Sequence, residues 1–319
     1  MVFSACDHGL IAAANYDTGV LMNESLIFQD TPDLVNPYIL IGLNGWLNAG
    51  EVATGCIDFL RRKLNAQKFA HIDSSRFHIW QVPGFDPAQI MRPHAVIEEG
   101  LIKSLAEPAS EFFFWKSGAE HDLILFTGSE PNLRWPEYAS AILSIAKRYR
   151  VPRIYSLGGV YDQVPHTRET KVFAVLSRPE LKSEFKSFPF LNYAGPCSFS
   201  TMLLNQAGGE GIEAAGITAR VPPYIQIFNA KACYDLLKKV FALTPLNIDL
   251  SDLKKSADNL VEMMDKSFSQ NETALKQLQK LEEMFDAAVL QEFGYTPGAN
   301  IDELMQEMLN MKKGGQKLH

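Results

Sequence analysis

The chain has 319 residues, with 30 basic and 37 acidic side chains, a formal net charge of −7 and 46% hydrophobic residues. This balance is typical of a globular protein with a large core, and it argues against a nucleic-acid partner, which usually requires a basic face. Four cysteines are too few for a disulfide framework and no apolar run could span a bilayer, so we expect a cytoplasmic protein without a membrane partner.

Buried strands alternate with helices through most of the chain. Residues 38–43 form an apolar run, and the spacing that follows predicts a helix over about 49–64. The same unit recurs at 123–128, with a helix that begins near Pro136 and extends to about residue 150. Further strands are predicted at 69–82, 111–116, 153–157, 171–176 and 212–219, and a further helix at 198–207. This alternation implies β-α-β crossovers and an α/β fold with a mainly parallel sheet.

The composition changes after Pro245, which divides the chain into an α/β domain over 1–245 and a helical extension over 246–319. One more helix is predicted over 301–312, followed by a flexible basic tail.

The long apolar pattern in the extension leaves two pairs of alternatives open. Residues 249–291 contain neither glycine nor proline, and their apolar residues follow helical spacing. Ser267 and Asn271 interrupt the pattern, so one continuous helix and a hairpin bent near 268–273 fit equally well. The extension is either a layer packed on the sheet or an oligomerisation segment, and the broken heptads favour neither.

The turn after the first strand is a candidate ligand site. Its candidate residues are Gly42, Gly45, Trp46, Asn48 and Gly50. They precede a predicted helix, whose N-terminal N–H groups attract anions such as phosphate. However, the glycine spacing matches neither the dinucleotide motif nor the triphosphate loop. The pattern therefore favours a sharp turn over a phosphate site.

The segment 158–168, which follows the predicted strand at 153–157, is the most distinctive in the chain. In open α/β sheets, ligand crevices lie at the carboxyl ends of the strands. There, His166 could move a proton near neutral pH and Arg168 could bind an anion. Without a nucleophile or a metal-binding partner in the pattern, a polar loop that contacts backbone or a neighbouring subunit is favoured. The candidate ligand or interface residues here are Gly158, Gly159, Asp162, Pro165, His166, Thr167 and Arg168.

Recognisable catalytic and metal-binding motifs are missing from the sequence. No two histidines have the spacing of metal ligands, and no complete G-x-S-x-G turn occurs. The segment 195–200 is superficially similar to that turn, but Pro196 and the missing second glycine break the match, so a helix cap at Ser198 or Ser200 is favoured. We therefore expect no metal, no cofactor and no catalytic residue, and a protein that is not an enzyme.

Two segments taken together point to a family. Residues 41–50 (IGLNGWLNAG) precede a helix, and residues 158–168 (GGVYDQVPHTR) follow a strand. Between them, residues 126–131 (FTGSEP) form a strand followed by a glycine, an acid and a proline. In order and separation these segments resemble the proteasome assembly chaperone family, of the second-subunit type, and its uncharacterised prokaryotic relatives. The resemblance covers about residues 38–243.

The resemblance implies a three-layer α/β/α sandwich similar to phosphorylase and nucleoside-hydrolase folds. It also implies a homo-oligomer, with a trimer expected, that binds other proteins. Prokaryotic relatives that dock on proteasomes end in a hydrophobic residue, a tyrosine and any residue, whereas this chain ends in Lys317-Leu318-His319, which weakens the expectation of direct docking. The main hypothesis is a non-catalytic assembly protein. The alternative is an enzyme or binding protein for a small anionic or nucleoside-like ligand at the carboxyl edge of the sheet.

Overall fold

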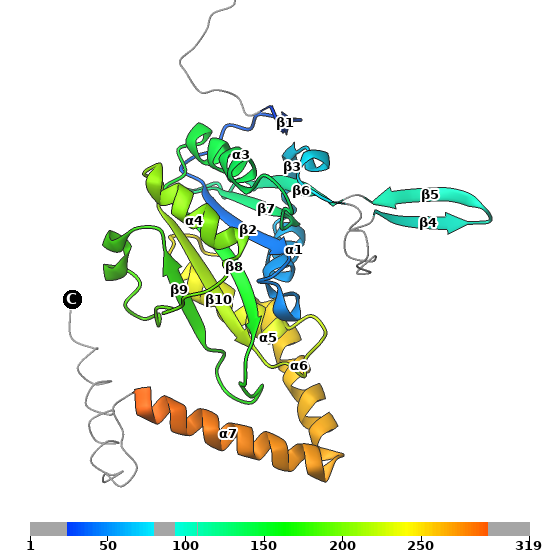
Figure 1. Cartoon of the computed structure of the whole chain (residues 1–319), viewed down its shortest axis with the longest axis vertical. Helices are drawn as coiled ribbons and strands as arrows, with labels where there is room; N and C mark the ends of the chain where they lie inside the picture. The colour runs from blue at the N-terminus through cyan, green and yellow to red at the C-terminus, as the bar shows by residue number, and fades with distance from the viewer. Residues whose placement is uncertain (1–23, 80–92, 107, 293–319) are drawn as a thin grey trace, which may run out of the picture.

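The computed structural model describes residues 24–79, 93–106 and 108–292 (Figure 1). The strands of its main sheet are β1 Leu26–Phe28, β2 Tyr38–Asn44, β3 Gln67–Ile72, β6 Ser110–Trp115, β7 Leu123–Ser129, β8 Ile154–Tyr161, β9 Val172–Leu176 and β10 Ala214–Val221. The α-helices are α1 Val52–Lys63, α3 Trp135–Arg148, α4 Phe199–Gly209, α5 Ala230–Phe241, α6 Ser251–Ser269 and α7 Glu272–Glu292. Within the described ranges, no helix is both long and apolar enough to cross a membrane.

The main sheet has eight strands in the order β1-β3-β6-β7-β2-β8-β10-β9. Its centre, β7-β2-β8-β10, is parallel, as the alternation predicts. The flanking strands run antiparallel to their neighbours, so the sheet is mixed and the prediction of a mainly parallel sheet holds only for the centre. The short turn at 116–122 shows the reason, because it cannot hold a crossover helix and therefore returns β7 antiparallel to β6.

Helices cover both faces of the sheet and give three layers. Successive strand residues point to opposite faces, so Leu40 packs in one core cluster while Ile39 and Ile41 pack in the other. The first cluster includes residues of α1 and α5, and the second includes residues of α3 and α4. Both clusters are apolar, which is why the central strands appear in the sequence as nearly continuous hydrophobic runs.

The helical extension is bent. α6 ends at Ser269, and the side chain of Asn271 accepts hydrogen bonds from the backbone N–H groups of Thr273 and Ala274 at the start of α7. α6 packs against α5, and α7 then turns back beneath the sheet (Figure 1). Of the two predicted forms, the bent one is present. The predicted helix over 301–312, the basic tail and the chain end at 317–319 lie outside the described residues.

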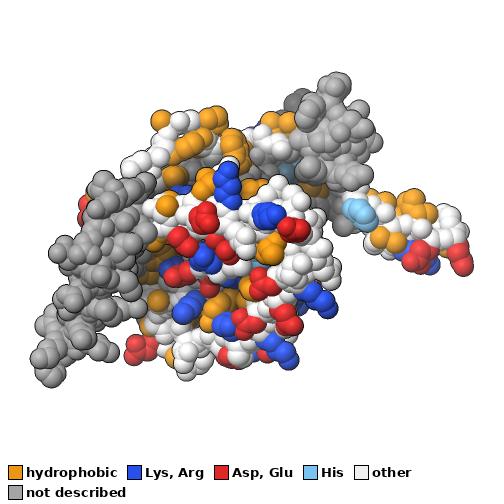
Figure 2. All heavy atoms as spheres, turned by 90° about the horizontal axis from the view of Figure 1, so that it is seen from below, with side chains coloured by type: hydrophobic (Ala, Val, Ile, Leu, Met, Phe, Trp, Pro, Cys, Tyr) orange, Lys and Arg blue, Asp and Glu red, His pale blue; other side chains and the backbone are white. Residues whose placement is uncertain are grey.

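A hairpin that we call the apolar arm projects from the body of the molecule (Figure 1). It consists of β4 His94–Glu98 and β5 Leu101–Ala106, which pair with each other and form a separate two-stranded sheet. Glu99 and Gly100 between them both have positive φ, as a tight two-residue hairpin turn requires. Figure 2 shows hydrophobic side chains exposed along this projection.

Candidate functional site

The glycines of the first candidate segment lie where elements pack closely. A Cβ atom on Gly42 would lie 2.0 Å from the carbonyl oxygen of Ala53 in α1. Gly50 has a φ of 58°, and its Cβ atom would lie 3.0 Å from the side chains of Val221 and Asn229. Asn48 holds the turn together, because its side-chain oxygen accepts the backbone N–H of Thr54 at 3.1 Å. Close packing therefore accounts for these residues without a ligand.

The two candidate glycine segments meet at the carboxyl edge of the sheet. The backbone N–H of Gly159 donates to the carbonyl oxygen of Leu47 at 2.9 Å, and Asn48 forms a β-bridge with Gly159. A Cβ atom on Gly159 would lie 2.6 Å from the carbonyl oxygen of Ala49. The two sequence segments that carry the family resemblance, 41–50 and 158–168, thus pack against each other in the fold.

His166 is buried and fully hydrogen-bonded. Its backbone N–H donates to the Tyr224 hydroxyl oxygen at 2.9 Å, and that hydroxyl lies 2.8 Å from His166 Nδ1. The Asp265 carboxylate of α6 can only accept, so Nε2 carries the hydrogen and donates to it at 3.1 Å, and Nδ1 of the neutral ring then accepts the Tyr224 hydroxyl hydrogen. Burial lowers the pKa of His166, with Asp265 opposing the shift, so the ring is held neutral.

Thr167 and Arg168 contact the last described helix. The Thr167 hydroxyl donates to Glu282, and the Arg168 guanidinium pairs with Asp286 at 2.9 Å and with Glu282 at 3.4 Å. Lys171 lies 5.0 Å from the ring centre of Phe285. A volume of only about 10 Å³ remains beside Pro165 and His166. These polar side chains therefore bind the C-terminal helices of their own chain.

The neutral His166 predicts a pH dependence of stability. Because its folded pKa lies below its ordinary value of 6.5, the unfolded chain takes up the proton first, and stability falls as pH drops from 6.5 towards the folded pKa. We expect His166→Gln, which cannot be protonated, to unfold at a lower urea concentration than the natural chain at pH 7.5. The difference between the two proteins should narrow by pH 5.5. An unchanged difference at both pH values would contradict the neutral ring.

A cavity of about 330 Å³, which we call the α4 cavity, opens beside these segments. Its floor comes from the small side chains Ser156 of β8 and Thr218 of β10, and α4 covers one side. Of the candidate residues, Trp46 and Asp162 line it. The other lining residues that matter here were missed by the sequence analysis: Ser156, Phe173, Tyr193, Ser200, Thr218 and Arg220. Small or hydroxyl residues at buried strand positions are the signal that could have located the floor.

Glu130, in the glycine-acid-proline segment after β7, holds the mouth of the α4 cavity together. One carboxylate oxygen accepts the backbone N–H of Trp46 at 2.7 Å, and the other accepts that of Phe199 at 2.6 Å. Ser198 starts α4 by accepting the backbone N–H of Thr201, as one of the predicted helix caps. The carboxylate therefore fixes the Trp46 turn relative to α4.

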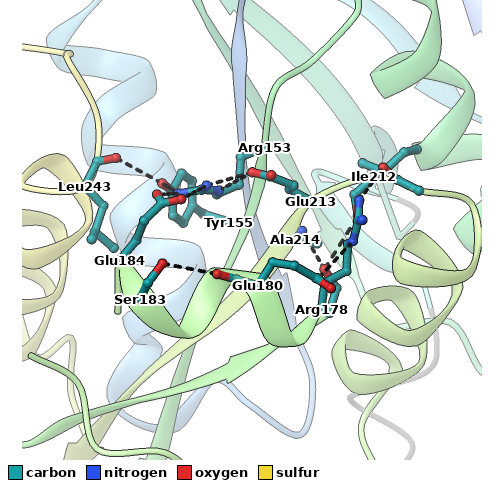
Figure 3. A network of polar contacts seen from close by, with 12 residues as sticks. Arg153, Tyr155, Arg178, Glu180, Ser183, Glu184, Ile212, Glu213, Ala214 and Leu243 are labelled. Carbon is teal, nitrogen blue, oxygen red and sulfur yellow. Dashed lines mark hydrogen bonds and ion pairs between the residues drawn. The ribbon is translucent and has the colours of Figure 1, made fainter. Parts of the chain in front are cut away.

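A polar cluster lies at the opposite end of β8 (Figure 3). The Arg153 guanidinium binds both carboxylate oxygens of Glu184, at 2.7 and 3.1 Å, and one oxygen of Glu213 at 2.7 Å. Tyr155 connects the cluster to the Leu243 carbonyl oxygen at 3.3 Å. These contacts connect the start of β8 to the segment after β9, to the residue before β10 and to the end of α5. We assign them a structural role. In the described part of the chain, no three His, Cys, Asp or Glu residues are placed to hold a metal ion.

Comparison with known proteins gives both a sequence match and a structural match. A family model described as the PAC2 family matches residues 42–267. A Mycobacterium tuberculosis protein of unknown function is 23% identical, with a TM-score of 0.75 over 88% of this chain and 95% of that one. No curated protein matches the chain in sequence.

Two further solved structures have descriptions that mention the proteasome. A proteasome-assembly chaperone homologue from Mycobacterium tuberculosis is 23% identical, with a TM-score of 0.67 over 75% of this chain and 98% of its own. An archaeal proteasome activator from Pyrococcus furiosus is 22% identical, with a TM-score of 0.58 over 76% of this chain and 97% of its own. At these identities, the likeness establishes a shared fold.

Proposed function

The chain belongs to the PAC2 family, and from this premise we propose that it is a non-catalytic cytoplasmic protein that assembles with itself and binds other proteins. Family membership relates it to the proteasome-assembly chaperone homologue and the archaeal proteasome activator. We propose a homotrimer, in which residues 246–319 extend the domain formed by 1–245. The likeness to phosphorylase and nucleoside-hydrolase folds stays a prediction, and a shared fold would bring no activity with it.

The apolar arm is the observation that supports self-assembly best. On β5, Ile102 and Leu105 lie opposite Ile97 and Ala95 and share one face, because the pairing shifts by one residue between them, and Leu101 lies on the other face. Ile102 is 73% exposed and Leu101 is 63% exposed, so neither face is buried in the single chain. A hairpin with two strands is marginally stable alone, and an exposed apolar patch usually marks an interface. We therefore propose that a surface of another chain covers the arm.

A second copy of the chain fits this need. When an arm of one subunit contacts a different surface of the next, the contact is heterologous and closes into a ring if the rotation allows it. A trimer is the smallest such ring. Outside the arm, the face seen in Figure 2 carries interspersed acidic and basic side chains, which makes it a weaker candidate for the main contact.

We expect Ile102→Asp combined with Leu105→Asp to prevent assembly, because each charge would lose its hydration at the interface. Light scattering during size-exclusion chromatography should give three times the 35.7 kDa chain mass for the natural protein and one chain mass for the variant. Met263→Asp is the matched control, since Met263 is 48% exposed but lies on α6. A natural chain that runs as a monomer, or a variant that stays trimeric, would refute the proposed assembly.

Partner binding is tested with the same proteins. The tagged natural chain and the arm variant are purified from the native cells, and the proteins retained in stoichiometric amounts are identified by mass spectrometry. Recovery of proteasome subunits by the natural chain supports the relation to the proteasome-associated relatives. Recovery of no stoichiometric partner would leave self-assembly as the whole of the proposed function.

A further inference from the structure

We propose that the α4 cavity binds an uncharged small molecule that contains a flat ring and one hydrogen-bonding group. The volume of about 330 Å³ lies within the range of roughly 300–1,000 Å³ in which proteins hold small ligands. The cavity lies at the carboxyl ends of the parallel strands β8 and β10, where open α/β sheets place their ligands. This site is independent of the apolar arm and of self-assembly.

Aromatic side chains from separate parts of the chain make the wall. Trp46 comes from the turn after β2, Tyr161 from the end of β8, Phe173 from β9 and Tyr193 from the loop before α4. Trp46 and Tyr193 are both largely exposed to solvent at the mouth. Such side chains offer ring faces for stacked or edge-to-face contacts. The wall therefore favours a planar ligand.

Thr218 on the floor supplies the polar contact. The residue is 4% exposed and lines the cavity, and its hydroxyl has no hydrogen-bond partner among the described residues. Because the hydroxyl lines the cavity and is not committed to another side chain, a ligand group in the cavity can donate a hydrogen bond to it or accept one from it. Nearby, Ser156 donates to the Ser200 hydroxyl at 2.9 Å, which leaves the Ser200 hydroxyl hydrogen for a second acceptor.

The charges around the cavity indicate that the ligand is neutral. Asp162 and Arg220 are the charged residues among the described lining, and they pair with each other at 2.6 Å. The lining therefore has no net charge and gives an anion no net electrostatic attraction. His166 and Arg168, the groups that the sequence suggests for an anion, instead bind α6 and α7. The neutral ligand replaces the anionic alternative for this edge of the sheet.

The test uses 2-naphthol as a neutral planar probe and 2-naphthoate as its anionic counterpart. Isothermal titration calorimetry on the full chain should show saturable binding of 2-naphthol, with 2-naphthoate at least about tenfold weaker. Equal or tighter binding of the carboxylate would overturn the neutral site. No binding of 2-naphthol up to its solubility would overturn the proposal itself.

Two variants locate the binding in the cavity. Thr218→Val removes the hydroxyl at nearly constant shape and should weaken 2-naphthol about fivefold to tenfold. The matched control is Thr127→Val, the same change on β7 outside the cavity, which should bind like the natural chain. Val175→Trp on β9 should fill the cavity and abolish binding. Melting curves establish that each variant is folded, and unchanged affinity in both cavity variants would refute the site.

Cys197 gives a separate readout of position, because its thiol is exposed at the cavity wall whereas Cys56 and Cys233 are buried. Saturating 2-naphthol should slow its reaction with a disulfide reagent, and Cys197→Ser identifies that phase. The arm variant, Ile102→Asp with Leu105→Asp, should bind 2-naphthol with unchanged affinity. Dissociation of the natural assembly by 2-naphthol would overturn the independence of the cavity from self-assembly.

Discussion

Gly42→Ala is expected to destabilise the protein by about 3 kcal/mol or more, at the upper end of what overpacking in a core costs. The added Cβ atom would lie 2.0 Å from the Ala53 carbonyl oxygen and 2.7 Å from its carbonyl carbon. Both are backbone atoms, so no side-chain rotation can relieve the contact. β2 cannot move away either, because Gly42 is held between Thr127 of β7 and Leu157 of β8.

The helix would have to move instead, and that movement also costs stability. Val52, Cys56 and Ile57 of α1 are completely buried, so a shift of the helix opens voids in the first core cluster. Urea unfolding followed by circular dichroism measures the effect. Gly209→Ala at the end of α4 is the control, since a Cβ there meets nothing within 4 Å and should change stability by less than about 1 kcal/mol. Equal unfolding midpoints for the two variants would contradict the close approach of β2 and α1.

Local patterns predict the centre of this fold well. The apolar runs at 38–43 and 123–128 correspond to β2 and β7, and Pro136 lies in the first turn of α3. These elements are predictable because burial on both faces leaves a continuous hydrophobic run in the sequence. By contrast, the predicted strand at 69–82 ends at Ile72 in β3. The hydrophobic pattern does not distinguish a strand from a partly buried loop that follows it, so it does not predict where the strand ends.

Contacts between distant residues explain what sequence patterns could not predict about the candidate site. The sequence leaves His166 either as a proton carrier or as part of a polar loop, and it does not show the partner Asp265, which is 99 residues away on α6. The α4 cavity is likewise assembled from β8, β9 and β10, and its floor exists because β10 lies between the other two. Only the strand order brings Ser156 and Thr218 onto one surface. The sequence pattern of a single segment therefore predicts neither the His166–Asp265 contact nor the floor of the α4 cavity.

Arg153→Leu is expected to destabilise the protein by about 2 kcal/mol at pH 7. Arg153 is 7% exposed, and its guanidinium binds two carboxylates (Figure 3). The guanidinium also lies over the Phe185 ring. The expected loss is below the 3–5 kcal/mol or so typical of a fully buried pair, because Glu184 and Glu213 are about half-exposed and water can solvate them. Arg153→Lys should recover only part of the loss, since an ammonium cannot bind Glu184 through two parallel hydrogen bonds.

The pH dependence of stability distinguishes the charge contribution of Arg153 from its packing against Phe185. The hydrogen bonds from Arg153 hold the pKa of Glu184 below its ordinary value of 4.5, so their contribution is present above pH 4.5 and is lost as pH falls through the folded pKa. Urea unfolding should therefore show a large gap between the natural chain and Arg153→Leu at pH 7 and a smaller one below pH 4. Arg178→Leu is the control, because Arg178 pairs with Glu180 at the surface and should cost less than about 1 kcal/mol at either pH. A gap that stays constant with pH would mean that Arg153 stabilises β8 through its contact with Phe185, with no contribution from its charge.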